Sequence, residues 1–363
     1  MLEIAIQQLQ VSEQEILDNF IDNLKSPVTK HSYQKHIEYY LTFCQMTKLS
    51  ELLAITEPDR QIRRYIKSLQ ERNLSTRSIN TMLYAIFHFY IYNDVILNTR
   101  KIISYVGQPT LKQEDRPYTH DEIKKILDVS DLRMKVIIGL MYSAGLRIGA
   151  IADLKLRHLQ KIEMCYKVTV YEGSKEMYYS FCTPECASFI QNYLEYRSTN
   201  GEQLTENSYL IRNQFDINDL EQIRNKSKGI QTGTLKVMLN TLLRKAGLRT
   251  VDRITPHKRK EVAMAHGMRK LFCTQLVKAK LQTEYRWFLE GHKMKGNDES
   301  YVKIEDDINE MFQQYKLAIN NLTVSDEYRL KEQVKSLLVN KSRIDELEEN
   351  LKKLESEYKK LKK

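Results

Sequence analysis

Apolar residues recur at helical spacing through the first hundred residues. Segments 29–45, 57–73 and 75–94 each carry an apolar stripe on one side, the first with Thr29 as a potential cap. Only 12 Gly and 6 Pro interrupt the 363 residues, which favours long helices over a sandwich or barrel of short strands. The sequence therefore predicts a mainly α protein whose residues 1–105 form a helical bundle.

A chain of this length is long for a single hydrophobic core, so we expect two domains. The segment 106–118 contains Gly and two Pro and is predicted to be a linker. Residues 119–322 form the predicted second domain, which begins with a Thr119–Glu122 capping box. Its strand signal is the alternating segment 166–185 around "EGSK", which predicts a β-hairpin and hence a small antiparallel sheet.

The tail, residues 323–363, keeps a heptad register in which eight of ten core positions are apolar or aromatic. Those eight are Leu330, Leu337, Ile344, Leu347, Leu351, Leu354, Tyr358 and Leu361. Gln333 and Asn340 occupy the other two, and Asn340 is of the type that fixes register. The pattern predicts a C-terminal coiled coil and a tail-mediated dimer. A long helix folded back on the body is the alternative.

The charge balance favours a polyanionic partner. The net charge is +10 and the pI about 9.1, which suits nucleic acid, although a merely basic cytosolic protein has the same balance. The segment 244–270 carries nine Lys or Arg against two acids and is the best candidate for phosphate contacts, a solvated loop being the alternative. The DNA-binding candidates are Arg77, Lys258, Arg259 and Lys260.

Several classes of protein are disfavoured. The five cysteines are odd in number and lack zinc-site spacing. The longest apolar run, 136–142, is too short to span a bilayer, and the N-terminus does not resemble a signal peptide. Neither a carboxylate cluster nor a P-loop occurs, so no metal ion or nucleotide cofactor is expected. The sequence predicts a soluble, cytoplasmic protein.

Six residues stand in short stretches that suggest chemistry: Arg147 in "SAGLRIGA", Lys175 in "EGSKE", His266 and Arg269 in "AHGMRKLF", and His292 and Tyr301 in "GHKMKGNDESY". Each has an ordinary structural explanation when taken alone, such as an ion pair, a solvated lysine or a helix face. Taken together they form an anion clamp beside a nucleophile. Two guanidinium groups can hold phosphodiester oxygens, tyrosine can attack phosphorus beside positive charge, and lysine can protonate a leaving oxygen.

The order and spacing of these six residues resemble the tyrosine recombinase (phage-integrase) family. In that family an arginine follows a "GLR" turn, a β-hairpin carries a lysine, and an HxxR helix, a "GH" and a tyrosine follow. The resemblance covers roughly residues 20–320 and identifies 1–105 as a DNA-clamping core-binding domain and 119–322 as the catalytic domain.

The resemblance implies a site-specific recombinase or integrase of a mobile element that acts as a tetramer on double-stranded DNA with a specific attachment site. Arg147 and Arg269 would hold the scissile phosphate, Lys175 would be the general acid, and His266 would accept or relay the tyrosine proton. His292 would bond a phosphate oxygen, and Tyr301 would form a 3′-phosphotyrosine without metal or ATP.

Two features depart from the family pattern. An acidic residue commonly stands three positions after the first arginine, where this chain has Ala150, and Asp153 is a candidate substitute. The long tail is the second departure. The alternatives are a type IB topoisomerase-like enzyme and a catalytically inactive DNA-bridging protein.

Overall fold

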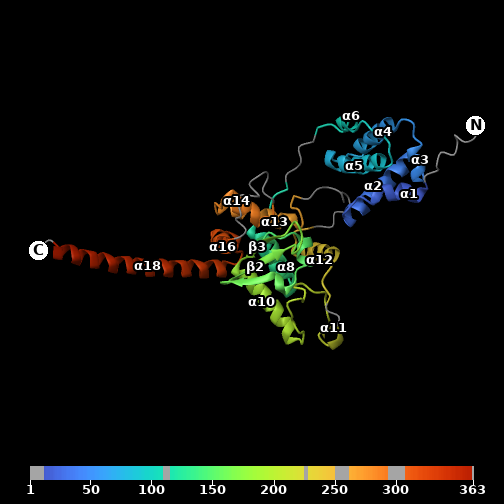
Figure 1. Cartoon of the computed structure of the whole chain (residues 1–363). Helices are drawn as coiled ribbons and strands as arrows, with labels where there is room; N and C mark the ends of the chain where they lie inside the picture. The colour runs from blue at the N-terminus through green and yellow to red at the C-terminus, as the bar shows by residue number, and fades with distance from the viewer. Residues whose placement is uncertain (1–11, 109–114, 225–227, 250–260, 293–306, 362–363) are drawn as a thin grey trace, which may run out of the picture. The chain divides into compact units, whose positions relative to one another are not determined.

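The computed structural model describes residues 12–108, 115–224, 228–249, 261–292 and 307–361. The chain divides into two units, Met1–Lys112 and Gln113–Lys363 (Figure 1). The first unit contains six helices in its described part: α1 (Glu13–Ile21), α2 (Pro27–Cys44), α3 (Leu49–Leu53), α4 (Pro58–Glu71), α5 (Thr76–Tyr92) and α6 (Thr99–Ser104).

Helix α2 of the first unit begins earlier than the sequence predicted. Its cap is Ser26, whose hydroxyl accepts the Thr29 N–H at 3.4 Å, and Pro27 occupies the first turn. The expectation that Thr29 caps the helix was therefore wrong, because serine directly before proline starts the helix three residues upstream. Helix α5 begins as its Ser-Thr pair indicated, with Ser75 accepting the Ser78 N–H at 3.2 Å.

The predicted apolar stripes of α2, α4 and α5 meet in the core of the first unit. The buried residues that these helices contribute include Ile37, Tyr40, Ile62, Tyr65, Ile66, Leu69, Ile79, Leu83, Ile86, Phe89 and Tyr90. Aromatic rings account for much of this core, and the Tyr90 hydroxyl donates to the Leu52 carbonyl at 3.2 Å. A buried tyrosine is tolerated because its polar end is paired.

The second unit contains the remaining elements. They are α7 (His120–Asp128), α8 (Leu132–Ser143), α9 (Ile148–Ala152), a 3-10 turn η1 (Leu156–His158), β1 (Leu159–Ile162), β2 (Cys165–Val170), β3 (Tyr178–Cys182), α10 (Pro184–Thr199), α11 (Leu220–Arg224), α12 (Thr232–Lys245), α13 (His266–Lys278), α14 (Thr283–Leu289), α16 (Ile308–Lys316), α17 (Ile319–Leu322) and α18 (Asp326–Leu361). The Thr119–Glu122 capping box at the start of α7 is confirmed.

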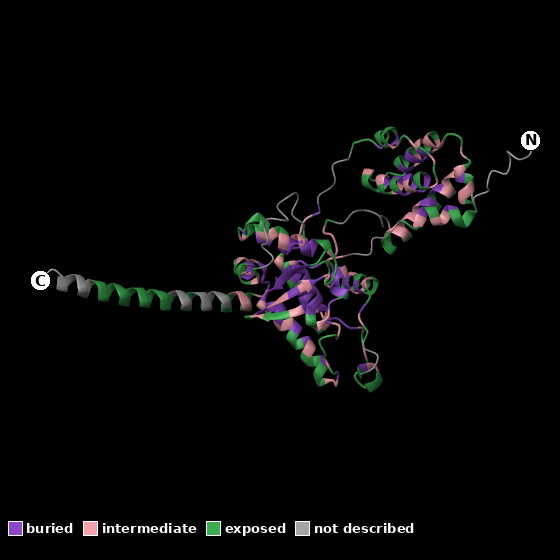
Figure 2. Cartoon of the chain, viewed as in Figure 1, coloured by how far each residue is buried: buried purple, intermediate pink, exposed green. Residues whose placement is uncertain are grey.

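Helix α8 lies at the centre of this unit. Its residues from 136 to 143 are all buried, and it packs against α10, α13 and β3 (Figure 2). A helix that is apolar on every side is expected to be surrounded by other elements. The helix therefore gives the turn after it, which leads into α9, a fixed position.

The sheet has three antiparallel strands in the order β1-β2-β3. The predicted hairpin is confirmed as β2 and β3, which pair from Tyr166↔Cys182 to Val170↔Tyr178. The sequence did not predict β1, which has four residues and pairs Leu159 with Val168. A strand this short offers too few alternations to be recognised. The prediction of a mainly α fold with a small antiparallel sheet is confirmed.

Helix α18 is joined to the body by a buried carboxylate. Glu185 of α10 is 2% exposed and accepts the backbone N–H groups of Val324 and Ser325, both at 2.9 Å, and the Tyr142 hydroxyl at 2.7 Å. Beyond this anchor the large apolar residues of the helix whose burial is described, from Leu330 to Leu354, are exposed (Figure 2). The alternative of a helix folded back on the body therefore gains no support, and the coiled coil stays a prediction.

Candidate active site

Arg269 connects three elements of the second unit through one buried guanidinium. The residue lies in α13 and is 4% exposed. Its Nη1 donates to the Gly145 carbonyl at 2.5 Å, and its Nη2 donates to the Glu290 carbonyl. Gly145 stands two residues before Arg147, and Glu290 stands two residues before His292. One arginine therefore holds the two turns that carry these other predicted site residues.

Both turns depend on glycine. Gly145 has φ +66° and Gly291 has φ +61°, in the left-handed region that residues with a Cβ disfavour. A Cβ on Gly145 would collide with the Phe272 ring. A Cβ on Gly291 would lie 2.6 Å from Cε1 and 2.7 Å from Cζ of Tyr178. The "AGLR" and "GH" glycines are thus required by close packing as well as by backbone conformation.

Arg147 caps α9 and is exposed. Its side chain makes no hydrogen bond or ion pair with the part of the chain that the structure describes. A guanidinium that serves a structural purpose normally has partners for its donors. Among the described residues, therefore, nothing neutralises the charge of Arg147 or occupies its donor groups.

His266 begins α13, one helical turn before Arg269. Burial lowers the pKa of His266, and the positive charges of Lys270, Arg269 and Arg147 lower it further, while Asp115 acts in the opposite direction. Lys270 itself is paired with Asp115 at 2.8 Å. The His266 imidazole is therefore neutral near pH 7 and able to accept a proton.

His292 follows Gly291 at the end of α14, and its side chain is 49% exposed. Burial lowers the pKa of His292. Glu290, whose Oε2 lies 3.0 Å from Nδ1, opposes that shift, and Arg269, Arg147 and Arg286 reinforce it. The His292 imidazole is therefore also neutral near pH 7, and Glu290 fixes its ring.

Two functional candidates in this region were missed by the sequence analysis. Glu290 is buried and lies between His292 and Arg286, with its Oε1 at 3.8 Å from the Arg286 Nε. The "EGH" spacing was the available signal for it. Tyr178 of β3 is 6% exposed, and its hydroxyl has no hydrogen-bond partner of ordinary geometry among the described residues. An aromatic residue in a strand is usually core, so no signal marked Tyr178.

The charges of the two arginines also reach Tyr178. Burial raises the pKa of Tyr178, whereas Arg269 and Arg147 lower it. The same two arginines act on His266 and His292. The positive charges of Arg147 and Arg269 thus act on both histidines and on a buried phenol, a combination that suits an anion-binding centre.

Lys175 is exposed in the β2–β3 connection, residues 171–177. It forms no hydrogen bond or ion pair with the described residues, and its charge is not among those that shift the pKa values of the two histidines. The prediction that the hairpin carries it is consistent with this position. The structure does not bring Lys175 against the other four residues.

The structure says less about Tyr301 and the predicted DNA-binding residues. Arg77 is exposed in the first turn of α5, and Tyr301, Lys258, Arg259 and Lys260 lie outside the described residues. No group of three or more His, Cys, Asp or Glu side chains that could hold a metal ion occurs among residues that the structure describes. The described helices also include none long and apolar enough to cross a membrane.

One departure from the family pattern lies in α9. Ala150 is buried in this helix, and Asp153 at its end is exposed and forms no ion pair in the described ranges. Asp153 therefore does not act as a substitute for the acidic residue within the described part of the chain. The acceptors that Arg269 has there are two neutral backbone carbonyls, which leave its charge in place.

Two family models match the chain. The Phage integrase family model matches residues 117–307, more than half of the chain, and the model of the phage integrase N-terminal SAM-like domain matches residues 17–93. The chain belongs to the phage integrase family. The resemblance drawn from the six residues is confirmed, and this integrase-family chain therefore belongs to a family of DNA strand-exchange enzymes.

The integrase-family chain has relatives of known name. It is 25% identical over 306 residues to tyrosine recombinase XerC of Leptospira interrogans, which covers 80% of this chain and 89% of the relative. It is 24% identical over 243 residues to tyrosine recombinase XerA of Pyrococcus horikoshii, covering 66% and 74% of the two chains.

Solved structures share the fold. The Tn1549 transposon integrase in complex with circular intermediate DNA superposes with a TM-score of 0.55 at 13% identity, covering 89% of this chain and 99% of that one. The lambda integrase tetramer bound to a Holliday junction gives a TM-score of 0.54 at 13% identity, covering 84% and 81%.

Proposed function

We propose that this integrase-family chain is a site-specific DNA recombinase that breaks and rejoins DNA strands through a 3′-phosphotyrosine at Tyr301. The observation that supports this function most is the Arg269 guanidinium, which joins the turns of Arg147 and His292 without a carboxylate. The resulting excess of positive charge suits a phosphodiester, whose charge grows as the phosphorus becomes pentacoordinate.

In the proposed reaction the Tyr301 oxygen attacks the scissile phosphorus, and the bond from phosphorus to the 5′-oxygen breaks. His266 takes the tyrosine proton, and its neutral state near pH 7 suits this role. Lys175 supplies a proton to the departing 5′-oxygen. Arg147, Arg269 and His292 bind the non-bridging oxygens. The number of phosphate ester bonds is unchanged, so the 5′-hydroxyl of another strand can reverse the step without ATP.

The rest of the proposal concerns the partners. Residues 1–105 are proposed to clamp double-stranded DNA with Arg77 among the contacts, and residues 119–322 to act as the catalytic domain. Lys258, Arg259 and Lys260 are proposed to contact the backbone near the cleavage point. The proposed assembly is a tetramer on an attachment site, and the proposed setting is intracellular integration of a mobile element.

The test uses a library of nicked duplexes with a randomised central sequence, in which the 5′-hydroxyl fragment diffuses away after cleavage. Wild type, Tyr301→Phe and a control, Tyr285→Phe, are compared for covalent adducts that resist SDS. The control removes another tyrosine hydroxyl, which bonds Glu310 at 3.0 Å. We expect adducts with wild type and the control only, and enrichment of one sequence in the recovered DNA.

Other outcomes contradict parts of the proposal. Adducts with Tyr301→Phe would identify a different nucleophile. Adducts without sequence enrichment, together with relaxation of a plasmid, would favour the topoisomerase-like alternative. If the protein binds the whole library but forms no covalent adduct, the inactive DNA-bridging alternative is favoured.

A further inference from the structure

Helix α18 carries an apolar seam that no other described segment of the chain covers. The helix has 36 residues and a length of about 54 Å. Its seam residues Leu330, Leu337, Ile344, Leu347, Leu351 and Leu354 are between 55% and 66% exposed. A single isolated helix gains little stability in water without packing of its apolar face. The seam therefore requires a partner.

The polar residues in the seam define the orientation of that partner. In heptad notation Leu330, Leu337, Ile344 and Leu351 occupy a positions, whereas the polar residues Gln333 and Asn340 occupy d positions together with Leu347 and Leu354. In an antiparallel pair each d residue faces an a residue of the other helix, so both amides would meet apolar side chains in every register. In a parallel pair d faces d, and the amides meet each other.

The charges beside the seam agree with a parallel pair in register. Such a pair brings each g residue close to the e residue five positions later on the other helix. Arg343 at g then faces Glu348 at e of the second copy, an attractive pair that occurs twice in a symmetric dimer. The next pairs toward either end, Ser336 with Lys341 and Asn350 with Glu355, contain no like charges.

We propose that α18 forms a parallel, in-register, two-stranded coiled coil with α18 of a second copy of this chain. Ile344 at a, followed by Leu347 at d, is the combination that favours two strands over three or four. Because Glu185 fixes the start of each helix to its own catalytic unit, the parallel arrangement holds two catalytic units at the same end of the coiled coil. The dimer forms without DNA and does not depend on catalysis at Tyr301.

The seam is tested by a pair of matched leucines in the full chain. Leu347 is a d residue and Leu338 is a b residue off the seam, and both are 60% exposed. Light scattering without DNA is expected to give twice the 43.0 kDa chain mass for wild type and Leu338→Asp. Leu347→Asp is expected to raise the dimer dissociation constant about 100-fold or more, since it buries a carboxylate. Both variants should unfold at the wild-type temperature.

The orientation is tested by charge reversal. Arg343→Glu and Glu348→Arg each place two like-charge pairs across a parallel seam, so each variant alone should dimerise more weakly than wild type. Mixed together, they should form heterodimers in preference to homodimers, because every pair is then attractive. The double variant should recover the wild-type mass.

Several results would overturn the inference. A wild-type monomer at every concentration, a trimeric or tetrameric mass, or equal loss with both leucine variants would exclude the two-stranded seam. Absence of heterodimer preference would exclude the parallel orientation. Dimerisation by Tyr301→Phe separates this inference from the proposed reaction, since the seam can be present whether or not the reaction occurs.

Discussion

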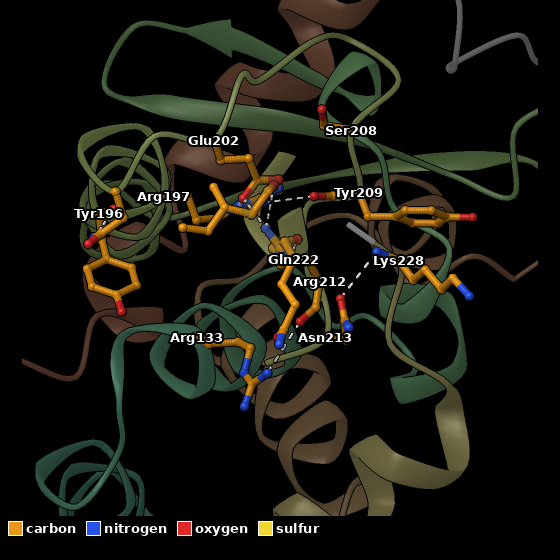
Figure 3. A network of polar contacts seen from close by, with 12 residues as sticks. Arg133, Tyr196, Arg197, Glu202, Ser208, Tyr209, Arg212, Asn213, Gln222 and Lys228 are labelled. Atoms are coloured by element: carbon orange, nitrogen blue, oxygen red, sulfur yellow. Dashed lines mark hydrogen bonds and ion pairs between the residues drawn. The ribbon is translucent and has the colours of Figure 1, made fainter. Parts of the chain in front are cut away.

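Two groups of arginines in the second unit are held in contrasting ways. Arg197 and Arg212 are fully buried, and both form ion pairs with Glu202, at 2.7 and 2.8 Å (Figure 3). Arg147 and Arg269 form no ion pair with a carboxylate among the described residues. In the first group one carboxylate offsets part of the charge of two guanidinium groups, whereas the second group has no carboxylate partner in the described part of the chain.

The buried group is a structural clamp on the chain after α10. Arg197 donates to the carbonyls of Tyr209 and Leu210, and Arg212 donates to that of Gln222 at 2.9 Å. Burial by itself raises the pKa of Glu202, but the hydrogen bonds from the two arginines outweigh it and lower the pKa. Glu202 therefore stays charged and completes the network.

The difference separates the structural arginines from the two that are proposed to bind a phosphate. A buried guanidinium needs its hydrogen bonds in either role, but only the structural group has a carboxylate partner among the described residues. Arg269 has a buried fork whose hydrogen-bond acceptors are neutral carbonyls. These hydrogen bonds hold the Arg269 side chain in place, and its positive charge remains able to attract a phosphate.

Removal of the Glu202 carboxylate, which both buried arginines share, should have the largest effect, a loss of stability. Glu202→Ala leaves two buried guanidinium groups without a counter-charge, and we expect a loss of about 3–5 kcal/mol in the free energy of unfolding. Urea denaturation followed by circular dichroism measures this loss. Glu195→Ala, which removes an exposed glutamate of α10, is the control and should change the unfolding free energy little. A loss below about 1 kcal/mol would mean that Glu202 does not neutralise the pair.

Removal of the exposed arginine should instead affect catalysis alone. Arg147→Ala is expected to slow adduct formation about 100- to 1000-fold, the typical cost of losing one group that stabilises transition-state charge. The unfolding temperature should not change, because Arg147 has no partner in the described part of the chain. Arg224→Ala removes another exposed arginine and should leave the rate unchanged. Equal losses of stability and rate would make Arg147 structural.

The sequence predicted much of this site because most of its residues stand in short local motifs. The HxxR spacing places His266 and Arg269 on one helical turn, and the Gly-Leu-Arg and Gly-His pairs mark two tight turns. The hydrogen bonds that join those turns could not be predicted. Arg269 donates to the carbonyls of Gly145 and Glu290, which lie 124 and 21 residues away in the sequence. Spatial packing, rather than local propensity, produces these bonds.

The buried clamp could not be recognised from the sequence either. Arg197, Glu202 and Arg212 lie within 15 residues, and charged residues at such spacing usually belong to solvated faces. Only the packing of the chain after α10 buries them. The four-residue strand β1 was missed for a different reason, because its local alternation is too short.

Replacement of Gly291, which follows the Glu290 carbonyl bound by Arg269, should have a smaller effect on stability. Gly291→Ala adds a Cβ at positive φ and against the Tyr178 ring, so we expect a loss of about 2–3 kcal/mol in unfolding free energy and slower cleavage. Gly173→Ala is the control, since its φ is +76° but nothing lies within 4 Å. It should lose only about 1 kcal/mol. Equal losses of unfolding free energy in the two variants would mean that backbone strain alone, and not the contact with Tyr178, destabilises Gly291→Ala.

The smallest expected effect is a change in the pKa values of His266 and His292 when the exposed Arg147 is replaced. Burial is the main reason that the pKa of His266 and of His292 is lowered, and Arg147 contributes to both shifts. Arg147→Ala should therefore raise both pKa values, because loss of a positive charge makes protonation easier. Titration of the histidine ring carbons by NMR measures this change. Arg147→Lys keeps the charge without the planar fork, so it should leave the pKa values near those of wild type while cleavage stays slow.

The same shifts set the pH dependence of cleavage. If His266 accepts the tyrosine proton, the rate should fall only as the pH drops below about 6.5, the ordinary imidazole value, because the pKa in the folded chain lies lower still. In Arg147→Ala this acidic limb should move to higher pH, whereas Glu195→Ala should leave it in place. A limb that stays fixed in Arg147→Ala would mean that Arg147 does not act on the proton acceptor. Its exposure would then be that of an ordinary surface arginine, and the contrast with the buried pair would be one of burial only.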